Sequence, residues 1–160
     1  AIGSRGAELF LCFGCRVLGY DVYPKELPGV VNVELEELLN QSDIVTLHCP
    51  MIESTRGLIN ENTISMMKEG AILLNASRGP VVDLSALSEA LKSGKLSAAG
   101  VDVYEIEPPL PQDHPILSAP NTILTPHIAY LSTESMEKRA KIVFDSLNAW
   151  LRGEQINKIV

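Results

Sequence analysis

The chain of 160 residues has ordinary globular composition, with 46% hydrophobic and 21% charged residues, and it is long enough to bury one sizeable core. Its formal charge of −7, from 13 basic and 20 acidic side chains, opposes the electrostatic attraction on which nucleic-acid binding depends. The sequence has neither the run of about 20 apolar residues that a membrane span requires nor the pattern of a secretory leader, so we expect a cytoplasmic protein that binds neither nucleic acid nor membrane.

The three cysteines are an odd number in a chain without a secretion pattern, which argues against a disulfide framework. Cys12 and Cys15 are spaced as C-x-x-C, but they fall at the predicted end of a helix, whereas reactive pairs lie at a helix N-terminus. No second pair is present to complete a zinc site. We therefore expect two inert thiols and no bound metal.

Helical and strand-like patterns alternate along the chain. Apolar positions recur at helical spacing from Gly3 to about Phe13, and Gly14 ends this run. Strands are predicted at residues 16–22, 30–33, 43–49, 71–77, 97–104 and 121–127. Further helices are predicted at residues 35–42, 60–70, 83–95 and 133–154, with Asn60 or Asn62 and Asp83 as N-caps and with Gly70 and Gly94 at the ends.

Strands that alternate with helices and are apolar along their length indicate a parallel sheet covered on both faces. The sequence therefore predicts an α/β domain of the doubly wound class at residues 1–132. A C-terminal helix and tail follow at residues 133–160, with the helix at residues 133–154. Residues 105–120 form one long irregular stretch that is rich in proline. A loop of that length in a compact domain usually has a function.

The start of the chain resembles half of a dinucleotide-binding motif. Ala1, Ile2 and Gly3 match the last three letters of the turn G-x-G-x-x-G. Asp21 follows 18 residues after Gly3, where a carboxylate in such a fold binds the adenosine ribose hydroxyls and repels a 2′-phosphate. This pattern favours NAD over NADP, and the alternative is a solvated aspartate at a strand end.

Chemically active side chains follow the last predicted strands, whose carboxyl ends are where ligands bind in such a sheet. Arg78 follows one strand, and its guanidinium suits a carboxylate; the alternative is a surface pair with a neighbouring acid. Asp102 lies between two valines, where an unpaired carboxylate is unfavourable to bury, so it needs a partner or a ligand. His127 ends the last strand, and Glu107 lies in the proline-rich loop.

An arginine, a carboxylate and a histidine at one edge meet the requirements for reduction of a 2-oxo acid. Arg78 would bind the substrate carboxylate and polarise the oxo group, while His127 donates a proton as hydride arrives from a nicotinamide. A neighbouring Glu107 would stabilise the imidazolium. The alternative for His127 is a strand-end histidine bonded to backbone, which is the role we expect for His48 and His114.

The segments NASRG, GVDVYEIEPP and TPHIA, in this order, resemble the signature segments of the D-isomer-specific 2-hydroxyacid dehydrogenase family, NAD-binding domain. The resemblance covers essentially the whole chain. It implies a Rossmann-like domain that binds NAD and forms homodimers, with Arg78, Glu107 and His127 as catalytic residues and with Asp102 reaching the nicotinamide carboxamide. The implied cofactor positions are Ala1, Ile2, Gly3, Asp21, Cys49, Pro50, Ala76, Arg78, Asp102, His127 and Ala129.

Two classes of function remain open at this point. Within the enzyme class, HCP, DVYEIEPP and TPHIAY are most similar to glycerate dehydrogenases, also called hydroxypyruvate reductases. D-3-phosphoglycerate dehydrogenases are the nearest alternative, and D-lactate dehydrogenases are less similar. The second class is a binding module, because transcriptional co-repressors use this fold as a dinucleotide-responsive dimerisation unit and can retain the three catalytic residues.

In this family the glycine turn follows a central strand, and the substrate domain is built largely from the sequence before it; neither precedes Ala1. We therefore interpret the chain as the C-terminal part of a longer polypeptide, with a final helix that returns toward the substrate domain. A sheet without its central strand would form two half-sheets with unpaired edges. We expect the 160 residues by themselves to be inactive and to aggregate, exchange strands or depend on an upstream piece.

Overall fold

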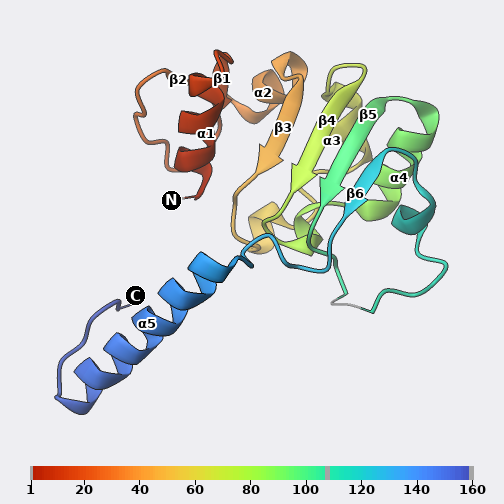
Figure 1. The fold of residues 1–160 in the computed structure, drawn as a ribbon. Helices are drawn as coiled ribbons and strands as arrows, with labels where there is room; N and C mark the ends of the chain where they lie inside the picture. Colours follow the sequence, from red (N-terminus) through yellow and green to blue (C-terminus); the bar gives the residue numbers. More distant parts are fainter. Residues whose placement is uncertain (1, 107–108, 159–160) are drawn as a thin grey trace. The chain divides into compact units, whose positions relative to one another are not determined.

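The computed structural model describes residues 2–106 and 109–158 (Figure 1). The chain divides into two compact units, residues 1–127 and 128–160, and each is described by itself. Ala1 and Glu107, two of the predicted site residues, lie outside the described residues. The predicted boundary after residue 132 stays a prediction.

The first unit contains four α-helices and six strands among its described residues. The helices are α1 (Ile2–Cys12), α2 (Leu35–Gln41), α3 (Glu61–Met66) and α4 (Leu84–Ser93). The strands are β1 (Val17–Gly19), β2 (Val30–Asn32), β3 (Ile44–Leu47), β4 (Ala71–Asn75), β5 (Leu96–Val101) and β6 (Thr122–Leu124). Three short 3₁₀ helices that the sequence did not predict are η1 (Glu53–Thr55), η2 (Gly79–Val81) and η3 (Pro115–Ser118).

The strands form two parallel sheets, as expected. One sheet pairs β1 with β2, and the other has the order β3-β4-β5-β6. Figure 1 shows β1 and β2 beside α1 at one end of the unit, next to β3. Because every pairing is parallel, the carboxyl ends of neighbouring strands lie at the same edge. Parallel sheets with flanking helices confirm the predicted α/β fold.

The larger sheet has one well-buried face. In β4, Ala71, Leu73 and Asn75 are buried, whereas the alternate residues are only half-buried, because successive side chains of a strand point to opposite faces. The buried residues join apolar side chains of α2, α3 and α4 in one core, and α3 and α4 lie behind this sheet in Figure 1. On the opposite face, Ile123 of β6 is 75% exposed. In the described part of the first unit, burial is therefore concentrated on one face.

Two predicted N-caps are confirmed. The Asn60 carboxamide oxygen accepts hydrogen bonds from the N–H groups of Asn62 and Thr63 at the start of α3. The Asp83 carboxylate accepts from two first-turn N–H groups of α4, and Gly94 ends that helix at a φ of 79°. Each cap satisfies N–H groups that have no partner within the helix, which stabilises the helix by about 1 kcal/mol.

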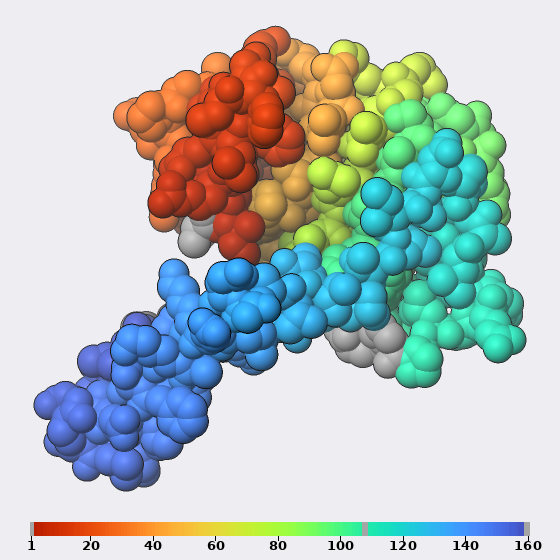
Figure 2. Space-filling view, viewed as in Figure 1, coloured from red at the N-terminus to blue at the C-terminus, as the bar shows by residue number. Residues whose placement is uncertain are grey.

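The C-terminal end of α1 has the predicted glycine. Gly14 has a φ of 79°, and its N–H donates to the Leu11 carbonyl while the Cys15 N–H donates to the Phe10 carbonyl. These bonds satisfy carbonyls that the helix leaves without partners. Cys12 and Cys15 both lie at this end and are exposed. No described residue of α1 is buried, and Figure 2 shows the helix at the surface.

The strand predicted at residues 97–104 is shorter in the structure. Its ladder with β6 ends where Val101 pairs with Leu124, because the chain beyond Leu124 turns away from a strand conformation. Asp102, Val103 and Tyr104 remain buried without belonging to β5. The polar Asp102 therefore stands just past the end of the strand.

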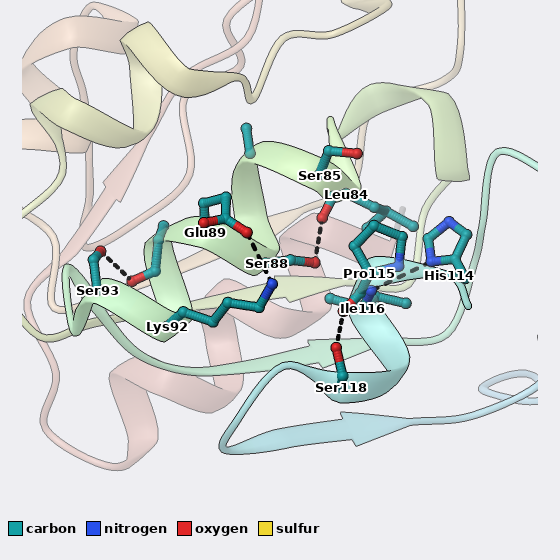
Figure 3. A network of polar contacts seen from close by, with 12 residues as sticks. Leu84, Ser85, Ser88, Glu89, Lys92, Ser93, His114, Pro115, Ile116 and Ser118 are labelled. Atoms are coloured by element: carbon teal, nitrogen blue, oxygen red, sulfur yellow. Dashed lines mark hydrogen bonds and ion pairs between the residues drawn. The ribbon is translucent and has the colours of Figure 1, made fainter. Parts of the chain in front are cut away.

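The proline-rich loop is anchored by His114 and η3. The His114 Nδ1 accepts a hydrogen bond from the Ile116 N–H at 3.3 Å, and its Nε2 lies 2.7 Å from a carboxylate oxygen of Glu105. Ile116 is fully buried in the core, and Figure 3 shows η3 lying against α4 near Leu84. The predicted structural role of His114 is thus confirmed, with a backbone partner at one ring nitrogen and an acidic partner at the other.

The second unit consists mainly of α5 (Thr133–Leu151), which is shorter than predicted. It begins with a capping box in which the Ser132 hydroxyl accepts from the Ser135 N–H and the Ser135 hydroxyl accepts from the Ser132 N–H. Glu134 lies in the first turn. Hydrogen bonds to its carboxylate from the Glu134 N–H and from the Ser132 side chain lower the pKa of Glu134. Negative charge at this end is favourable because it faces the positive end of the helix dipole.

Among the glycines of the first unit, Gly79 makes the closest backbone contact. A Cβ atom at this position would lie 1.9 Å from the carbonyl carbon and oxygen of Tyr104 and 2.5 Å from the Glu105 nitrogen. Backbone atoms cannot move aside as the end of a flexible side chain can. The start of η2 therefore packs against residues 104 and 105 only because residue 79 has no side chain.

We predict that Gly79→Ala lowers the free energy of unfolding by about 3 kcal/mol or more, as severe overpacking does. Gly6→Ala is the matched control, because a Cβ there would meet His48 Nε2 at an ordinary 3.6 Å. Gly6 lies inside α1, so its replacement is expected to stabilise the protein by about 0.5–1 kcal/mol. Denaturant unfolding of the whole protein measures both changes, and equal stability of the two variants would contradict the assignment.

Candidate functional site

Two backbone hydrogen bonds join the last residue of β4 to the loops that follow β5 and β6. The Asp102 N–H donates to the Asn75 carbonyl at 2.9 Å, and the His127 N–H donates to the Asp102 carbonyl at 2.7 Å. These bonds keep the segments that follow neighbouring strands next to each other. The three loops, with Arg78 in the first, therefore lie side by side at the carboxyl edge of the larger sheet.

Asn75 shapes the loop that carries Arg78. Its side chain is 1% exposed; the carboxamide oxygen accepts from the N–H and hydroxyl of Ser77, and the nitrogen donates to the Arg78 carbonyl at 3.1 Å. Ala76 and Arg78 are exposed, and Arg78 Nη1 donates to the Ser77 carbonyl at 2.6 Å. Within residues 2–106 and 109–158, Arg78 forms no ion pair with an acid, so the alternative of a surface salt bridge is not observed there.

Asp102 has the partner that its burial requires. The residue is 5% exposed, and its carboxylate accepts a hydrogen bond from the Thr125 hydroxyl, just past the end of β6. A buried carboxylate without donors would be strongly unfavourable. Sequence reasoning did not identify Thr125, because the only local signal is its place two residues before His127.

His127 has a backbone conformation that is rare for a residue with a side chain. Its φ is 56°, in the left-handed region, which is a source of strain of about 1–3 kcal/mol. Its N–H is held by two carbonyls, that of Asp102 and that of Thr125, the latter at 3.1 Å. Strain of this kind clusters at functional sites, and here it directs a half-buried imidazole from the end of the sheet.

The Tyr104 hydroxyl bridges the ends of β5 and β6. Its hydroxyl lies 3.2 Å from the Val101 carbonyl and 3.1 Å from the Thr125 carbonyl. Burial, together with the negative charge of Asp102, raises the pKa of Tyr104. The phenol therefore stays protonated at neutral pH and remains a hydrogen-bond donor between the two strand ends.

The first turn of α1 packs closely on His48. A Cβ at Gly3 would lie 3.2 Å from the His48 Cβ, which leaves little room for a side chain. We expected His48 to bond to backbone, but its Nε2 lies 3.1 Å from the Thr46 hydroxyl, because alternate residues of a strand share a face. Partial burial lowers the pKa of His48, so the neutral ring is favoured at neutral pH.

Asp21 and Cys49 follow two different strands, and the charge of Asp21 acts on the Cys49 thiol. Asp21 follows β1, is exposed, and accepts a hydrogen bond from the Tyr23 N–H at 2.9 Å. Cys49 follows β3; burial raises the pKa of its thiol, and the negative charge of Asp21 raises it further. The exposed Pro50 comes next in the chain. Three of the predicted cofactor residues thus belong to this neighbouring pair of strand ends, whereas Ala129 belongs to the second unit.

The donors and acceptors of the first unit fit a dinucleotide. No acidic side chain stands in the first turn of α1, which includes Ile2 and Gly3, so its N–H groups suit a phosphate. The carboxylates of Asp21 and Asp102 suit hydroxyl and amide donors. Among the described residues no three side chains are grouped as metal ligands, and no helix has the length and apolar character to cross a membrane.

Comparison with known proteins agrees with this geometry. Residues 1–129 match the family described as D-isomer specific 2-hydroxyacid dehydrogenase, NAD binding domain. The chain is 41% identical to a hydroxypyruvate reductase from Blautia hydrogenotrophica, over 99% of this chain and 50% of that protein. It is 46% identical to a glyoxylate reductase from Korarchaeum cryptofilum, over 96% of this chain and 47% of that protein.

A solved structure has a closely similar fold. The D-lactate dehydrogenase from Lactobacillus jensenii with NAD+ has a TM-score of 0.92 and 34% sequence identity, over 99% of this chain and 52% of that chain. The present chain thus spans about half the length of these relatives. With the matched segment covering most of its residues, the chain belongs to the D-isomer-specific 2-hydroxyacid dehydrogenase family and carries that family's NAD-binding domain.

Proposed function

We propose that this chain is the nucleotide-binding part of an enzyme that transfers a hydride between NAD(H) and a small D-2-hydroxy acid or 2-oxo acid. The observation that carries the proposal is the pair of backbone bonds through Asp102, which hold the loops of Arg78 and His127 together. Hydroxypyruvate is the proposed 2-oxo substrate, supported by the similarity to a hydroxypyruvate reductase and a glyoxylate reductase. Phosphohydroxypyruvate is the alternative substrate.

In this proposal Arg78 and His127 have different roles toward the substrate. The exposed Arg78 guanidinium binds the substrate carboxylate with paired hydrogen bonds and polarises the neighbouring oxo group. His127 donates a proton to the oxo oxygen, which becomes the hydroxyl, and accepts it back in the reverse direction. NADH, when bound, supplies the hydride to the carbonyl carbon. Glu107, by its place in the family pattern, stabilises the protonated His127.

The cofactor contacts are likewise proposals. The first turn of α1 would bind the pyrophosphate, and Asp21 would bind the adenosine ribose. Asp102 would accept a hydrogen bond from the nicotinamide carboxamide, in keeping with its buried, oriented carboxylate. The remaining proposed contacts are Ala1, Cys49, Pro50, Ala76 and Ala129.

Replacement of His127 by Ala in the whole protein is expected to lower kcat by roughly 10²–10⁴-fold, because it removes the general acid. Arg78→Ala is expected to raise KM for the 2-oxo acid as well. Arg16→Ala, at the amino end of β1 and thus at the opposite edge of its sheet, serves as the charge control and leaves both constants unchanged. NADH oxidation with hydroxypyruvate, glyoxylate, phosphohydroxypyruvate and pyruvate measures these effects.

Near-normal turnover of the His127 variant would refute its proposed role. Absence of turnover by the wild-type protein with all four acids, combined with retained NADH binding, would instead favour a dinucleotide-responsive binding module.

Asp21 is expected to make kcat/KM higher with NADH than with NADPH, since its carboxylate repels a 2′-phosphate. Asp21→Asn keeps an acceptor for the Tyr23 N–H but removes the charge, so the NADPH-to-NADH ratio of kcat/KM should rise roughly tenfold. Glu26→Gln, an exposed acid of the same loop, is the control and should leave the ratio unchanged. A wild-type preference for NADPH would overturn the proposal for Asp21.

We further propose that the whole protein is a cytoplasmic homodimer. The support is the family resemblance, whose members usually dimerise through this domain. Light scattering at micromolar concentration is expected to give twice the mass of the whole polypeptide. A monomer under these conditions would contradict the assembly.

A further inference from the structure

We infer that Thr125 is a positioning residue whose hydroxyl holds the Asp102 carboxylate in the orientation that receives the nicotinamide end of the cofactor. The inference rests on the proposed function, because it takes Asp102 as the carboxylate that contacts the cofactor. It adds a residue that neither touches the cofactor in the proposal nor belongs to the three catalytic side chains.

The hydrogen bond between these residues is specific in direction. Asp102 is almost completely buried just past β5, and Thr125 Oγ1 donates to its Oδ1. Threonine branches at Cβ, so its χ1 rotamers are restricted and the position of the hydroxyl oxygen is well defined. A donor fixed in this way restricts the rotation of the carboxylate.

The backbone of Thr125 is fixed independently of its hydroxyl. Its N–H donates to the Val101 carbonyl at 3.0 Å, and its carbonyl accepts from the Tyr104 hydroxyl and from the His127 N–H, each at 3.1 Å. The chain thus needs no side-chain bond to keep residue 125 in place. What the hydroxyl adds, in the described part of the chain, is the bond to Asp102.

Thr122, the first residue of the strand that precedes Thr125, shows what a structural threonine does. Its hydroxyl donates to the Ala119 carbonyl at 3.3 Å, at the amino end of β6. The two threonines are both half-buried and differ in the partner of their hydroxyl: a backbone carbonyl for Thr122 and a carboxylate for Thr125. Hydrogen bonds to a charged group are the stronger kind, so the loss of the Thr125 hydroxyl has the larger consequence.

The experiment uses the whole protein with Thr125→Val, which keeps the shape and removes the donor. NADH affinity is measured by fluorescence titration, and steady-state rates give KM for NADH and kcat. We expect Kd and KM for NADH to rise roughly tenfold with a smaller change in kcat, as for a lost hydrogen bond to a charged group. Thr125→Ser restores the donor and should restore affinity, whereas Thr122→Val, the matched control, should bind NADH as the wild type does.

A double-mutant cycle separates positioning from general weakening of the fold. If Thr125 acts through Asp102, then Thr125→Val added to Asp102→Asn changes Kd little beyond the single Asp102 variant. If Thr125→Val does not fold, Thr125→Ala is compared with Thr125→Ser in the same cycle. Equal losses of affinity in both backgrounds would overturn the inference, as would wild-type affinity of the Thr125→Val protein.

The outcome also distinguishes this inference from the proposed function. A wild-type protein that binds NADH but reduces no 2-oxo acid refutes the proposed activity, and loss of NADH affinity in Thr125→Val alone would still support the positioning role. A wild-type protein that binds no NADH refutes both.

Discussion

The site depends on one constraint: two main-chain hydrogen bonds, from Asp102 to Asn75 and from His127 to Asp102, hold together the residues at the carboxyl ends of β4, β5 and β6. Without them, the loops after three parallel strands would be free to diverge, since parallel strands leave a sheet without a turn that ties them together. Because the bonds use backbone atoms, they fix the loops whatever side chains these carry. The close approach at Gly79 adds a second backbone contact between the first and second of these loops.

Much of the fold could be predicted because it follows from local patterns. Asn60, Asp83 and Gly94 act where their own chemistry places them, at helix ends. Arg78, Asp102 and His127 could be assigned to one edge since parallel strands place their carboxyl ends together. Whether these side chains have the proposed roles stays a prediction.

The rest depends on contacts between distant segments. The bond between Thr125 and Asp102 joins positions 23 residues apart, and threonines near strand ends are too common for one to be selected from sequence. The left-handed backbone of His127 could not be foreseen, because glycine and asparagine are the usual residues there. The three histidines likewise differ by tertiary setting: His114 anchors a loop, and His48 bonds a threonine beside α1.

The three cysteines differ in how readily their thiols react with added reagents. Thiolates, not thiols, react with alkylating reagents, and the raised pKa of Cys49 keeps that side chain protonated beside Asp21. Cys12 and Cys15 are exposed at the far end of α1 from Gly3. Within these 160 residues, a fluorophore or crosslinker used at neutral pH would therefore attach at the C-terminal end of this helix before it reacted with Cys49.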